Sequence, residues 1–419
     1  MKKFLSIALA LLMVCVMLPV VALADGTSLP EADATTGEIT LTENVTLSGD
    51  VTLDGKTINT AGHTITIAGN ATISNCTFKN AVEGDTANKD SHTVLYVSVG
   101  ATLNMTGCMI ESASYQPLYV AGTCTLASTD IKCTVANNKY DAYSMVIVDG
   151  TSATLNMKSG SITMVESTVM SDGMYGVYAC NGGSVNIGDA ATHTGPTITS
   201  HCAALGMNNT TAPAVWNIYG GTFTSKMRAD NNEWWKYFAA VLYAPGQGTV
   251  NIFDGSFTGG NYAVSMPWSD AGAALNISGG TFANTSTDEN DGLFYYREKS
   301  SNNNTGTPEV KISGGNFNDT LVAGDVENKK MTVSGGTFAD QENAKKYIEN
   351  DKLVVNPATG KVESKTITII VPGDTTPTED TPKTDDQKNP STGANDFVGL
   401  AAAAAVVALL GSAVVLRKK

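Results

Sequence analysis

A short sequence pattern recurs through the second half of the chain and combines the features of a strand and a tight corner. Each copy has an apolar–polar–apolar triplet, a corner usually made of two glycines, and then a small polar residue followed by phenylalanine. The copies occupy residues 216–223, 250–257, 275–282, 310–317 and 331–338, with shorter versions of the triplet at 103–105, 155–157 and 185–187. Alternation of this kind is typical of a strand with one buried face, so each copy predicts a strand, a corner and a second strand.

A second apolar segment precedes the triplet in several units, so that each unit contains three short strands. Examples are residues 94–97, 145–148, 176–179 and 240–243. The phenylalanines are unevenly spaced, which disfavours a rigid helical solenoid and fits a coil whose loops vary in length. One coil cannot bury its own inward face, so coils must stack, at about 4.8 Å per coil. The sequence therefore predicts an all-β fold, a parallel β-helix with three strands per coil.

Strand alternation also predicts two columns of side chains along such a stack. The polar residue of each triplet points outward and gives a column of amides: Asn104, Asn156, Asn186, Asn217, Asn251 and Asn276. The phenylalanine of each third strand points inward and gives an aromatic column: Phe223, Phe257, Phe282, Phe317 and Phe338. We interpret both columns as structural rather than catalytic.

The segments flanking the repeat predict where the β-helix begins and ends. Short alternating strands from Ile39 onward can start it, and we assign residues 25–339 to the β-helix. Residues 340–350 predict a short helix with Asp340 as its N-cap, and residues 354–362 predict a hairpin. We assign residues 340–371 to a C-terminal cap over the last coil, which would otherwise expose edge strands. Residues 372–388 are rich in Thr, Pro and Asp and predict a disordered linker.

Both ends of the chain carry apolar segments that predict export. Residues 1–24 have two lysines, an apolar stretch and Ala-Leu-Ala, which is typical of a secretory signal cut between Ala24 and Asp25. Residues 397–416 are an uninterrupted apolar run followed by Arg-Lys-Lys, long enough to span a bilayer. On composition alone this tail is either a permanent membrane anchor or part of a processed signal. We predict an extracellular protein that contacts the membrane only through this segment.

Three sequence features resemble known families. The pentapeptide Asn389-Pro390-Ser391-Thr392-Gly393, directly before the apolar run, resembles the LPXTG sorting signal of sortase-anchored Gram-positive surface proteins. That resemblance implies that a sortase cuts between Thr392 and Gly393 and attaches Thr392 to peptidoglycan in the cell wall. The coil pattern is similar to the pectate-lyase-type right-handed parallel β-helix, and the Ile-Ser-Gly-Gly-Thr-Phe phrase resembles repeats in surface proteins of gut Firmicutes. These resemblances imply a β-helix fold and a location at the cell wall, and they do not imply an activity.

Charge and composition narrow the classes of partner. The chain has 40 acidic and 26 basic residues and a formal net charge of −14, which disfavours nucleic acid and anionic polymers. It contains only three arginines, and residues 25–371 lack the Asn-Thr-Asp, Asp-Asp and Gly-His-Gly combinations of polygalacturonases. We therefore predict that the protein is not an enzyme, with a polysaccharide lyase or glycoside hydrolase as the alternative.

Aromatic residues in predicted loops of successive coils suggest a glycan-binding surface. The candidate residues are Trp234, Trp235, Tyr237, Trp268, Tyr295 and Tyr296, with Asp230 and Asp270 as hydrogen-bonding groups. Aromatic faces stack on sugar rings, while carboxylates accept hydrogen bonds from hydroxyl groups. The alternative is that these rings pack the insertions onto the β-helix. We predict an adhesin-like or carbohydrate-binding protein that recognises glycans or a host surface, with a non-binding structural spacer as a further alternative.

The sequence gives little support for a metal site and leaves one disulfide open. Residues 288–292 resemble a Ca²⁺ loop faintly, but their spacing departs from the EF-hand order, so we expect an acidic turn and no cofactor. Cys76 and Cys108 occupy equivalent positions in neighbouring predicted coils. Stacking places them within range of a disulfide, and a buried pair of thiols is the alternative.

Overall fold

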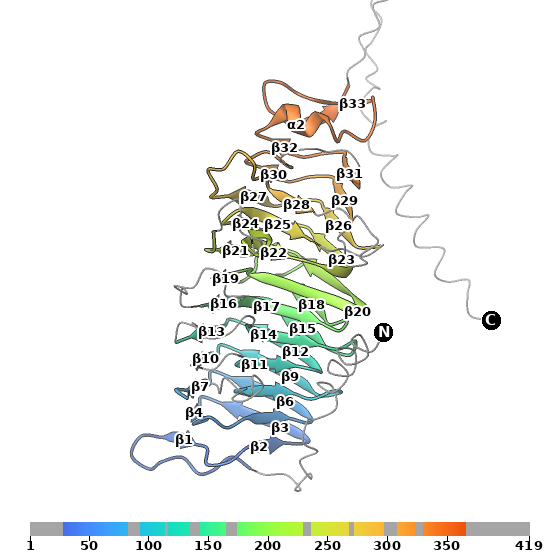
Figure 1. The fold of residues 1–419 in the computed structure, drawn as a ribbon. Helices are drawn as coiled ribbons and strands as arrows, with labels where there is room; N and C mark the ends of the chain where they lie inside the picture. The colour runs from blue at the N-terminus through green and yellow to red at the C-terminus, as the bar shows by residue number, and fades with distance from the viewer. Residues whose placement is uncertain are drawn as a thin grey trace, which may run out of the picture. The chain divides into compact units, whose positions relative to one another are not determined.

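The computed structural model describes residues 28–82, 93–113, 116–134, 143–164, 174–228, 236–267, 272–296, 308–322 and 330–365. Within these ranges the chain forms the predicted right-handed parallel β-helix, in which strands of successive coils lie one above another (Figure 1). The strands form three long sheets, here named A, B and C. The segments predicted to be a secretory signal, a linker and a sorting motif (Asn389 to Gly393), and the apolar tail, lie outside the described residues. No helix in the described ranges is both long enough and apolar enough to cross a bilayer.

Sheet A contains the third strand of each coil. Its members are β1 Glu38–Thr40, β4 Thr57–Asn59, β7 Thr77–Asn80, β10 Met109–Ser112, β13 Thr129–Cys133, β16 Gly160–Thr163, β19 Thr197–Ser200, β21 Thr222–Ser225, β24 Ser256–Gly259, β27 Thr281–Asn284, β30 Asn316–Phe317 and β32 Thr337–Phe338.

Sheet B contains the first strand of each coil, which is the apolar segment that precedes the triplet. Its members are β2 Val45–Leu47, β5 Ile65–Ile67, β8 Leu95–Val97, β11 Leu118–Val120, β14 Tyr143–Asp149, β17 Met174–Cys180, the first part of β20 Leu205–Ile218, β22 Ala240–Tyr243, β25 Tyr262–Met266 and β28 Phe294–Tyr296.

Sheet C contains the strands with the apolar–polar–apolar triplet. Its members are β3 Asp50–Asp54, β6 Asn70–Ser74, β9 Thr102–Thr106, β12 Thr123–Ala127, β15 Thr154–Met157, β18 Ser184–Ile187, the end of β20, β23 Gly246–Ile252, β26 Ala274–Ile277, β29 Glu309–Ile312 and β31 Lys330–Val333. Strand β20 is continuous from sheet B into sheet C, so these two sheets join at that coil.

The described pairings between successive coils are parallel, and the pairing of β20 with β23 shifts register between Asn209 and Ala214. Leu275 of β26, for example, lies opposite Val250 of β23 on one side and Val310 of β29 on the other. Each of these three inward side chains is fully buried. One face of every strand therefore lines a single continuous core, and the other face is available for solvent or for packing.

The aromatic column predicted on sheet A is present. Ring centroids are 4.9 Å apart for Phe223–Phe257 and for Phe257–Phe282, 5.0 Å for Phe282–Phe317 and 4.8 Å for Phe317–Phe338. The last three ring pairs are within 7° of parallel. The same inward position holds isoleucine at Ile198 and in the coils before it, back to Ile110. Rings and aliphatic chains thus fill one column at the spacing set by the strands.

The Gly-Gly corner has a steric cause at each of its two positions. A Cβ added to Gly279 would lie 2.1 Å from the carbonyl oxygen of Phe253 in the preceding coil. Gly280 has a φ of 96°, a conformation that other residues rarely adopt. The first glycine permits close stacking of coils, and the second permits the turn into the third strand.

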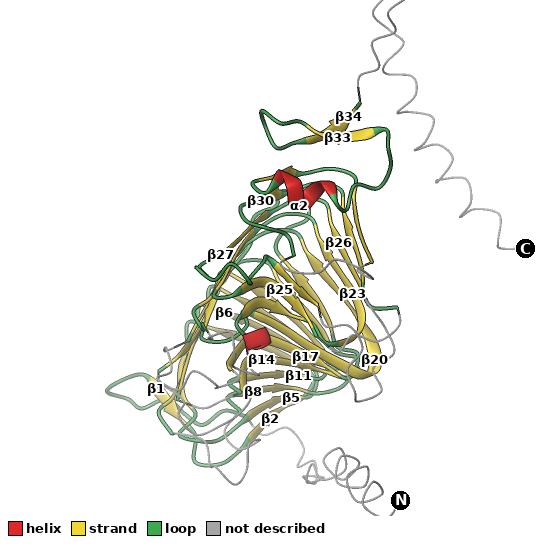
Figure 2. Cartoon of the chain, turned by 45° about the horizontal axis from the view of Figure 1, so that its top comes forward, coloured by secondary structure: helices red, strands yellow, loops and turns green. Residues whose placement is uncertain are grey.

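A small cap covers the last coil, as predicted. Helix α2, Gln341–Lys345, has Asp340 as its N-cap, whose Oδ1 accepts a hydrogen bond from the Asn343 N–H at 3.0 Å. Strands β33 Leu353–Val355 and β34 Val362–Ser364 form the antiparallel hairpin. Figure 2 shows α2 beside the end of the coils, next to β30.

The cap takes up hydrogen bonds that the last coil would otherwise leave open. The backbone N–H of Val333 donates to the carbonyl of Tyr347, and that of Phe338 donates to the carbonyl of Gly360. The terminal edge of the stack is thereby paired within the same chain rather than left for another.

Candidate functional site

The structure describes only some of the residues predicted to bind glycan. Trp234, Trp235, Trp268, Asp230 and Asp270 lie outside the described residues. For Tyr296 the structure describes only the backbone, in β28, where the residue pairs with Met266. Tyr237 and Tyr295 are the two candidates whose side chains are described.

Tyr237 serves packing rather than an open surface. It lies in the short 3₁₀ helix η1, Lys236–Phe238, and only 6% of it is exposed. Its ring is 4.5 Å from that of Phe238 and 6.4 Å from those of Tyr243 and Tyr295. Tyr295 is half-buried, and its ring also contacts Tyr262 at 5.1 Å. The alternative interpretation, that rings pack the insertions onto the β-helix, holds for Tyr237.

Tyr295 belongs to a larger aromatic column on the outer face of sheet B, and Tyr237 packs against that column. Successive outward positions hold Tyr96, Tyr119, Ile147, Tyr178, Gly206, Tyr243, Ser265 and Tyr295. The alternation in Leu-Tyr-Val at residues 95–97 and 118–120 already places these rings outward, but they are not among the residues predicted from the sequence. This column is the main set of aromatic residues that sequence reasoning missed.

The outer face of sheet B is largely closed. Tyr175 and Tyr243 are each 5% exposed, and Ile147 is also buried. At Gly206 the missing side chain leaves room for Tyr175, whose Cδ1 would be 2.6 Å from an added Cβ. Burial raises the pKa of Tyr178 to about 12. A surface this sealed stabilises the coils and offers little area to a ligand.

The acidic loop before β28 arranges its carboxylates around an amine. The Lys236 ammonium contacts the carboxylate of Asp291 and lies 3.6 Å from Oδ2 of Asp288. Asp288 Oδ1 also accepts hydrogen bonds from the backbone N–H and the side-chain amide of Asn290, and these bonds lower the pKa of Asp288. A basic side chain therefore contacts both of these carboxylates. The described residues hold no group of three or more His, Cys, Asp or Glu side chains placed to bind a metal.

The outer face of sheet C differs from that of sheet B because it is open and polar. Its central column contains the amide ladder, here defined as Asn156, Asn186, Asn217, Asn251 and Asn276. From Asn186 onward, each Nδ2 in the ladder donates to Oδ1 of the asparagine one coil earlier, at 2.9–3.0 Å. The three internal amides each use one of their two N–H groups and one oxygen lone pair in this way, which leaves one of each for a ligand.

Asn104 is not part of this ladder, and the prediction that it stacks with Asn156 is wrong. It lies in the same column, but Thr125 of β12 stands between the two amides. The triplet of the intervening coil is Cys124-Thr125-Leu126, which has threonine in place of asparagine and therefore does not match the repeat pattern. At the other end Lys311 and then Thr332 continue the column.

An aromatic pair lies beside the amide ladder on sheet C. Tyr219 and Phe253 follow the triplets of β20 and β23, and their rings stack with centroids 5.0 Å apart and planes 11° from parallel. Phe253 is 37% exposed, and Tyr219 is half-buried. Stacked rings of this kind form a flat apolar platform within a polar surface.

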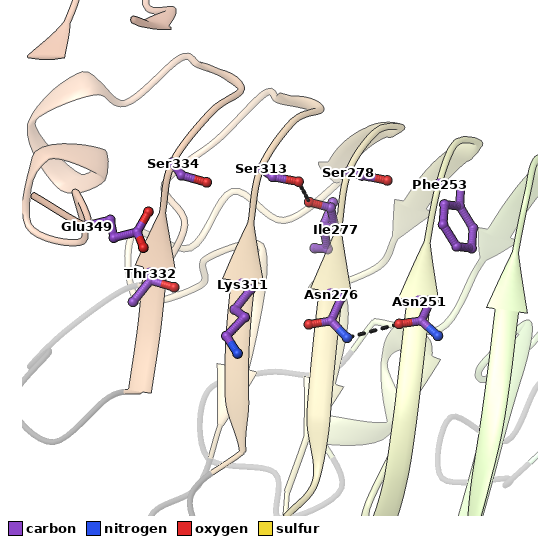
Figure 3. A pocket seen from close by; sticks show the side chains of 10 residues that line it. All are labelled: Asn251, Phe253, Asn276, Ile277, Ser278, Lys311, Ser313, Thr332, Ser334 and Glu349. Carbon is purple, nitrogen blue, oxygen red and sulfur yellow. Dashed lines mark hydrogen bonds between the residues drawn. The ribbon is translucent and has the colours of Figure 1, made fainter. Parts of the chain in front are cut away.

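Hollows lie on either side of the aromatic pair. One, of ≈ 340 Å³, is lined by Phe253, Asn251, Asn276, Lys311 and Glu349 among others (Figure 3). The other, of ≈ 550 Å³, is lined by Tyr219, Asn156, Asn186, Lys158 and Asp189 among others. Each hollow thus combines a ring, amides of the ladder, one lysine and one carboxylate.

This face can bind a ligand by stacking and hydrogen bonding, while catalytic carboxylates are not assembled on it within the described residues. Asp254 contacts His193, with Oδ2 and Nδ1 3.6 Å apart. Asp288 and Asp291 instead contact Lys236 beside sheet B. The described candidates for a general acid and base therefore divide between two separate places.

Cys76 and Cys108 lie in register in neighbouring coils, at the turn before β7 and β10. None of the six cysteines among the described residues forms a disulfide in this structure: Cys76, Cys108, Cys124, Cys133 and Cys202 are buried, and Cys180 is half-buried. The Cys108 thiol lies 3.4 Å from the carbonyl oxygens of Ile73 and Thr106. Burial raises the pKa of both Cys76 and Cys108, which keeps the thiols protonated at neutral pH.

No protein-family model, curated protein or solved structure matches this chain in comparisons with known proteins. Function therefore has to be argued from the chemistry of the outer face of sheet C.

Proposed function

We propose that this protein is a cell-surface protein of a Gram-positive bacterium that binds glycan through the outer face of sheet C. The proposed cell-surface location rests on the predicted secretory signal at residues 1–24 and on the predicted sorting motif that ends at Thr392-Gly393. The binding role rests on one observation, the stacked pair of half-buried Tyr219 and exposed Phe253 beside the amide ladder.

A sugar chain matches the chemistry of this face. Pyranose rings present C–H groups that stack on aromatic faces, and their hydroxyl groups pair with amides that still have a donor and an acceptor available. The surface repeats at the coil spacing of about 4.8 Å, which is close to the length of one sugar residue in an extended chain. Each hollow balances a lysine with a carboxylate, and the chain as a whole has a net charge of −14. These features favour a neutral, linear glycan over a polyuronate.

A glycan array probed with the full chain tests the proposal. Loss of both rings in the double variant Tyr219→Ala, Phe253→Ala should weaken binding about tenfold or more, because aromatic stacking contributes about 0.5–1.5 kcal/mol per ring pair beyond its buried area. The matched control is Tyr96→Ala, which removes a ring from sheet B. Equal weakening in both variants, or binding that neither change affects, would refute the assignment to sheet C.

The same array separates the alternatives. Glycan retained intact supports a binding protein, whereas shortened or unsaturated products would identify a hydrolase or a lyase. The wall location is tested separately by digesting purified cell walls and sequencing the released fragments by mass spectrometry. The expected fragment ends at Thr392 with a cell-wall peptide attached, and a chain that retains Gly393 would contradict sortase processing.

A further inference from the structure

Beside sheet B the structure brings together an amine and a carboxylate, both almost completely out of water. Lys236 is 8% exposed, and the Asp291 side chain is fully buried. The Lys236 Nζ contacts Oδ1 of Asp291. Surface lysines and aspartates rarely give up their hydration in this way, since burying an ion pair costs more than its attraction returns unless further hydrogen bonds compensate.

The partners come from equivalent places in three successive coils. Lys236 lies before β22, Asn261 lies before β25, and Asp291 lies before β28. The coils are held in register at this corner by the Asn261 N–H, which donates to the Ala239 carbonyl, and by the Ala263 N–H, which donates to the Leu293 carbonyl. The contact between Lys236 and Asp291 therefore rests on backbone pairing and not on two flexible loops.

The second oxygen of the Asp291 carboxylate is surrounded by donors. Oδ2 accepts a hydrogen bond from Asn261 Nδ2 at 2.7 Å and another from the Ser286 hydroxyl. Tyr262 also hydrogen-bonds to Asp291, and burial followed by the Asp291 charge raises the pKa of Tyr262, so its phenol keeps its proton. Donors fixed in this way stabilise negative charge that develops on an oxygen during acyl transfer.

We propose that Lys236 and Asp291 condense to form an intramolecular isopeptide bond. In this step the Asp291 carboxylate takes a proton from the Lys236 ammonium, which gives the neutral amine and acid. The amine lone pair attacks Cγ of Asp291, and the negative charge that develops resides on Oδ2, where Asn261 and Ser286 donate. Oδ1 then leaves as water with one proton from the acid and one from the amine nitrogen, and no oxidant or cofactor is consumed.

Three properties of the site favour this reaction. The amine and the carboxyl are held in contact by the fold, which replaces a bimolecular encounter by an intramolecular one. Burial favours the neutral amide product over two buried ions. Asp288, with Oδ2 3.6 Å from Nζ, is a second carboxylate beside the nitrogen and can relay the nitrogen's proton to the departing Oδ1.

The bond would act as a covalent staple along the β-helix. It would close a loop that contains β22 to β27 and would tie together coils that are otherwise joined by hydrogen bonds. Like a disulfide, such a cross-link limits the unfolded chain and resists separation of the coils. Unlike a disulfide it is not reduced by thiols.

Mass spectrometry of the denatured full chain tests the proposal. The intact mass should be one water molecule below the mass of the same chain with an unreacted Lys236 and Asp291. A tryptic digest should contain a branched peptide that joins the Lys236 and Asp291 segments, with no cleavage after Lys236. In Lys236→Arg and in Asp291→Ala the missing water should be restored and the branched peptide should vanish.

The control within the same molecule is Lys345 and Glu342, an exposed pair at 2.6 Å that should stay unlinked. Cleavage after Lys236 in the wild-type digest, together with the full sequence mass, would overturn the proposal and leave a salt bridge. Loss of ammonia instead of water would also overturn it, because the bond would then be to Asn261. Since wild-type digestion carries this result, it does not depend on whether the variants fold.

Discussion

Replacing Phe282 by alanine should lower the free energy of unfolding by about 4 kcal/mol, near the middle of the range for buried phenylalanine. Phe282 is fully buried, and its ring stacks on Phe257 at 4.9 Å and on Phe317 at 5.0 Å. Removing it forfeits two stacking contacts, each of about 0.5–1.5 kcal/mol beyond the buried area, and opens a cavity. The cavity cannot collapse, because Thr281 is held by backbone pairing to Ser256 on one side and to Asn316 on the other.

Equilibrium unfolding in guanidinium chloride, followed by circular dichroism, measures this loss. Phe282→Leu should recover about half of it, because the same column accepts isoleucine at Ile198 and leucine keeps most of the apolar volume. Phe338→Ala should cost less, since Phe338 closes the described column and stacks on Phe317 alone. A loss below about 1 kcal/mol for Phe282→Ala, or equal losses at both positions, would refute the account of a tightly stacked column.

Three further changes test other parts of the structure. Gly206→Ala would place a Cβ 2.6 Å from Cδ1 of Tyr175, so the tyrosine ring would have to move. The free energy of unfolding should fall by about 1–3 kcal/mol. An unchanged midpoint of thermal unfolding would contradict this packing. Asn217→Ala breaks two hydrogen bonds of the amide ladder and should lower the free energy of unfolding by about 1–2 kcal/mol. Asn104→Ala, outside the ladder, should lower it much less. Urea unfolding of both variants measures the difference. Burial raises the pKa of Tyr178 from 10.0 to about 12, so the unfolded chain releases this proton first as pH rises. The contribution of Tyr178 to stability should be complete below pH 10 and be lost at about 1.4 kcal/mol for each pH unit between pH 10 and pH 12. A flat urea midpoint between pH 9 and pH 11 would contradict the assignment.

The fold could be predicted because its signal is local and repeated. Each triplet such as Leu275-Asn276-Ile277 specifies a strand and its inward face by alternation alone, and each glycine pair marks a corner. The stack then follows from the need to bury that face against a neighbour. Asp340 and the residues after it carry an ordinary capping signal, so the short helix was also within reach of the sequence.

The amide ladder and the Lys236–Asp291 contact depend on which coils are neighbours in the stack. The sequence pattern alone does not give that order. The coil that contains Thr125 lacks the asparagine used as a marker, so Asn104 was placed one coil too close to Asn156. The contact between Lys236 and Asp291 requires three coils to align across loops of unequal length. The aromatic pair on sheet C was visible as Tyr219 and Phe253 in the corner of two copies, but its exposure follows only from the geometry of the sheet.

The direction of the amide ladder has a consequence for how this molecule can change in size. Each of its coils offers an identical donor toward the N-terminal neighbour and an identical acceptor toward the C-terminal one. Excision of residues 219–252 would join Ile218 to Phe253 and set Asn276 against Asn217 without altering the pairing rule. Duplication of the same segment would insert one more matching rung. Genetic gain or loss of whole coils in this region can therefore shorten or extend the displayed surface in discrete steps.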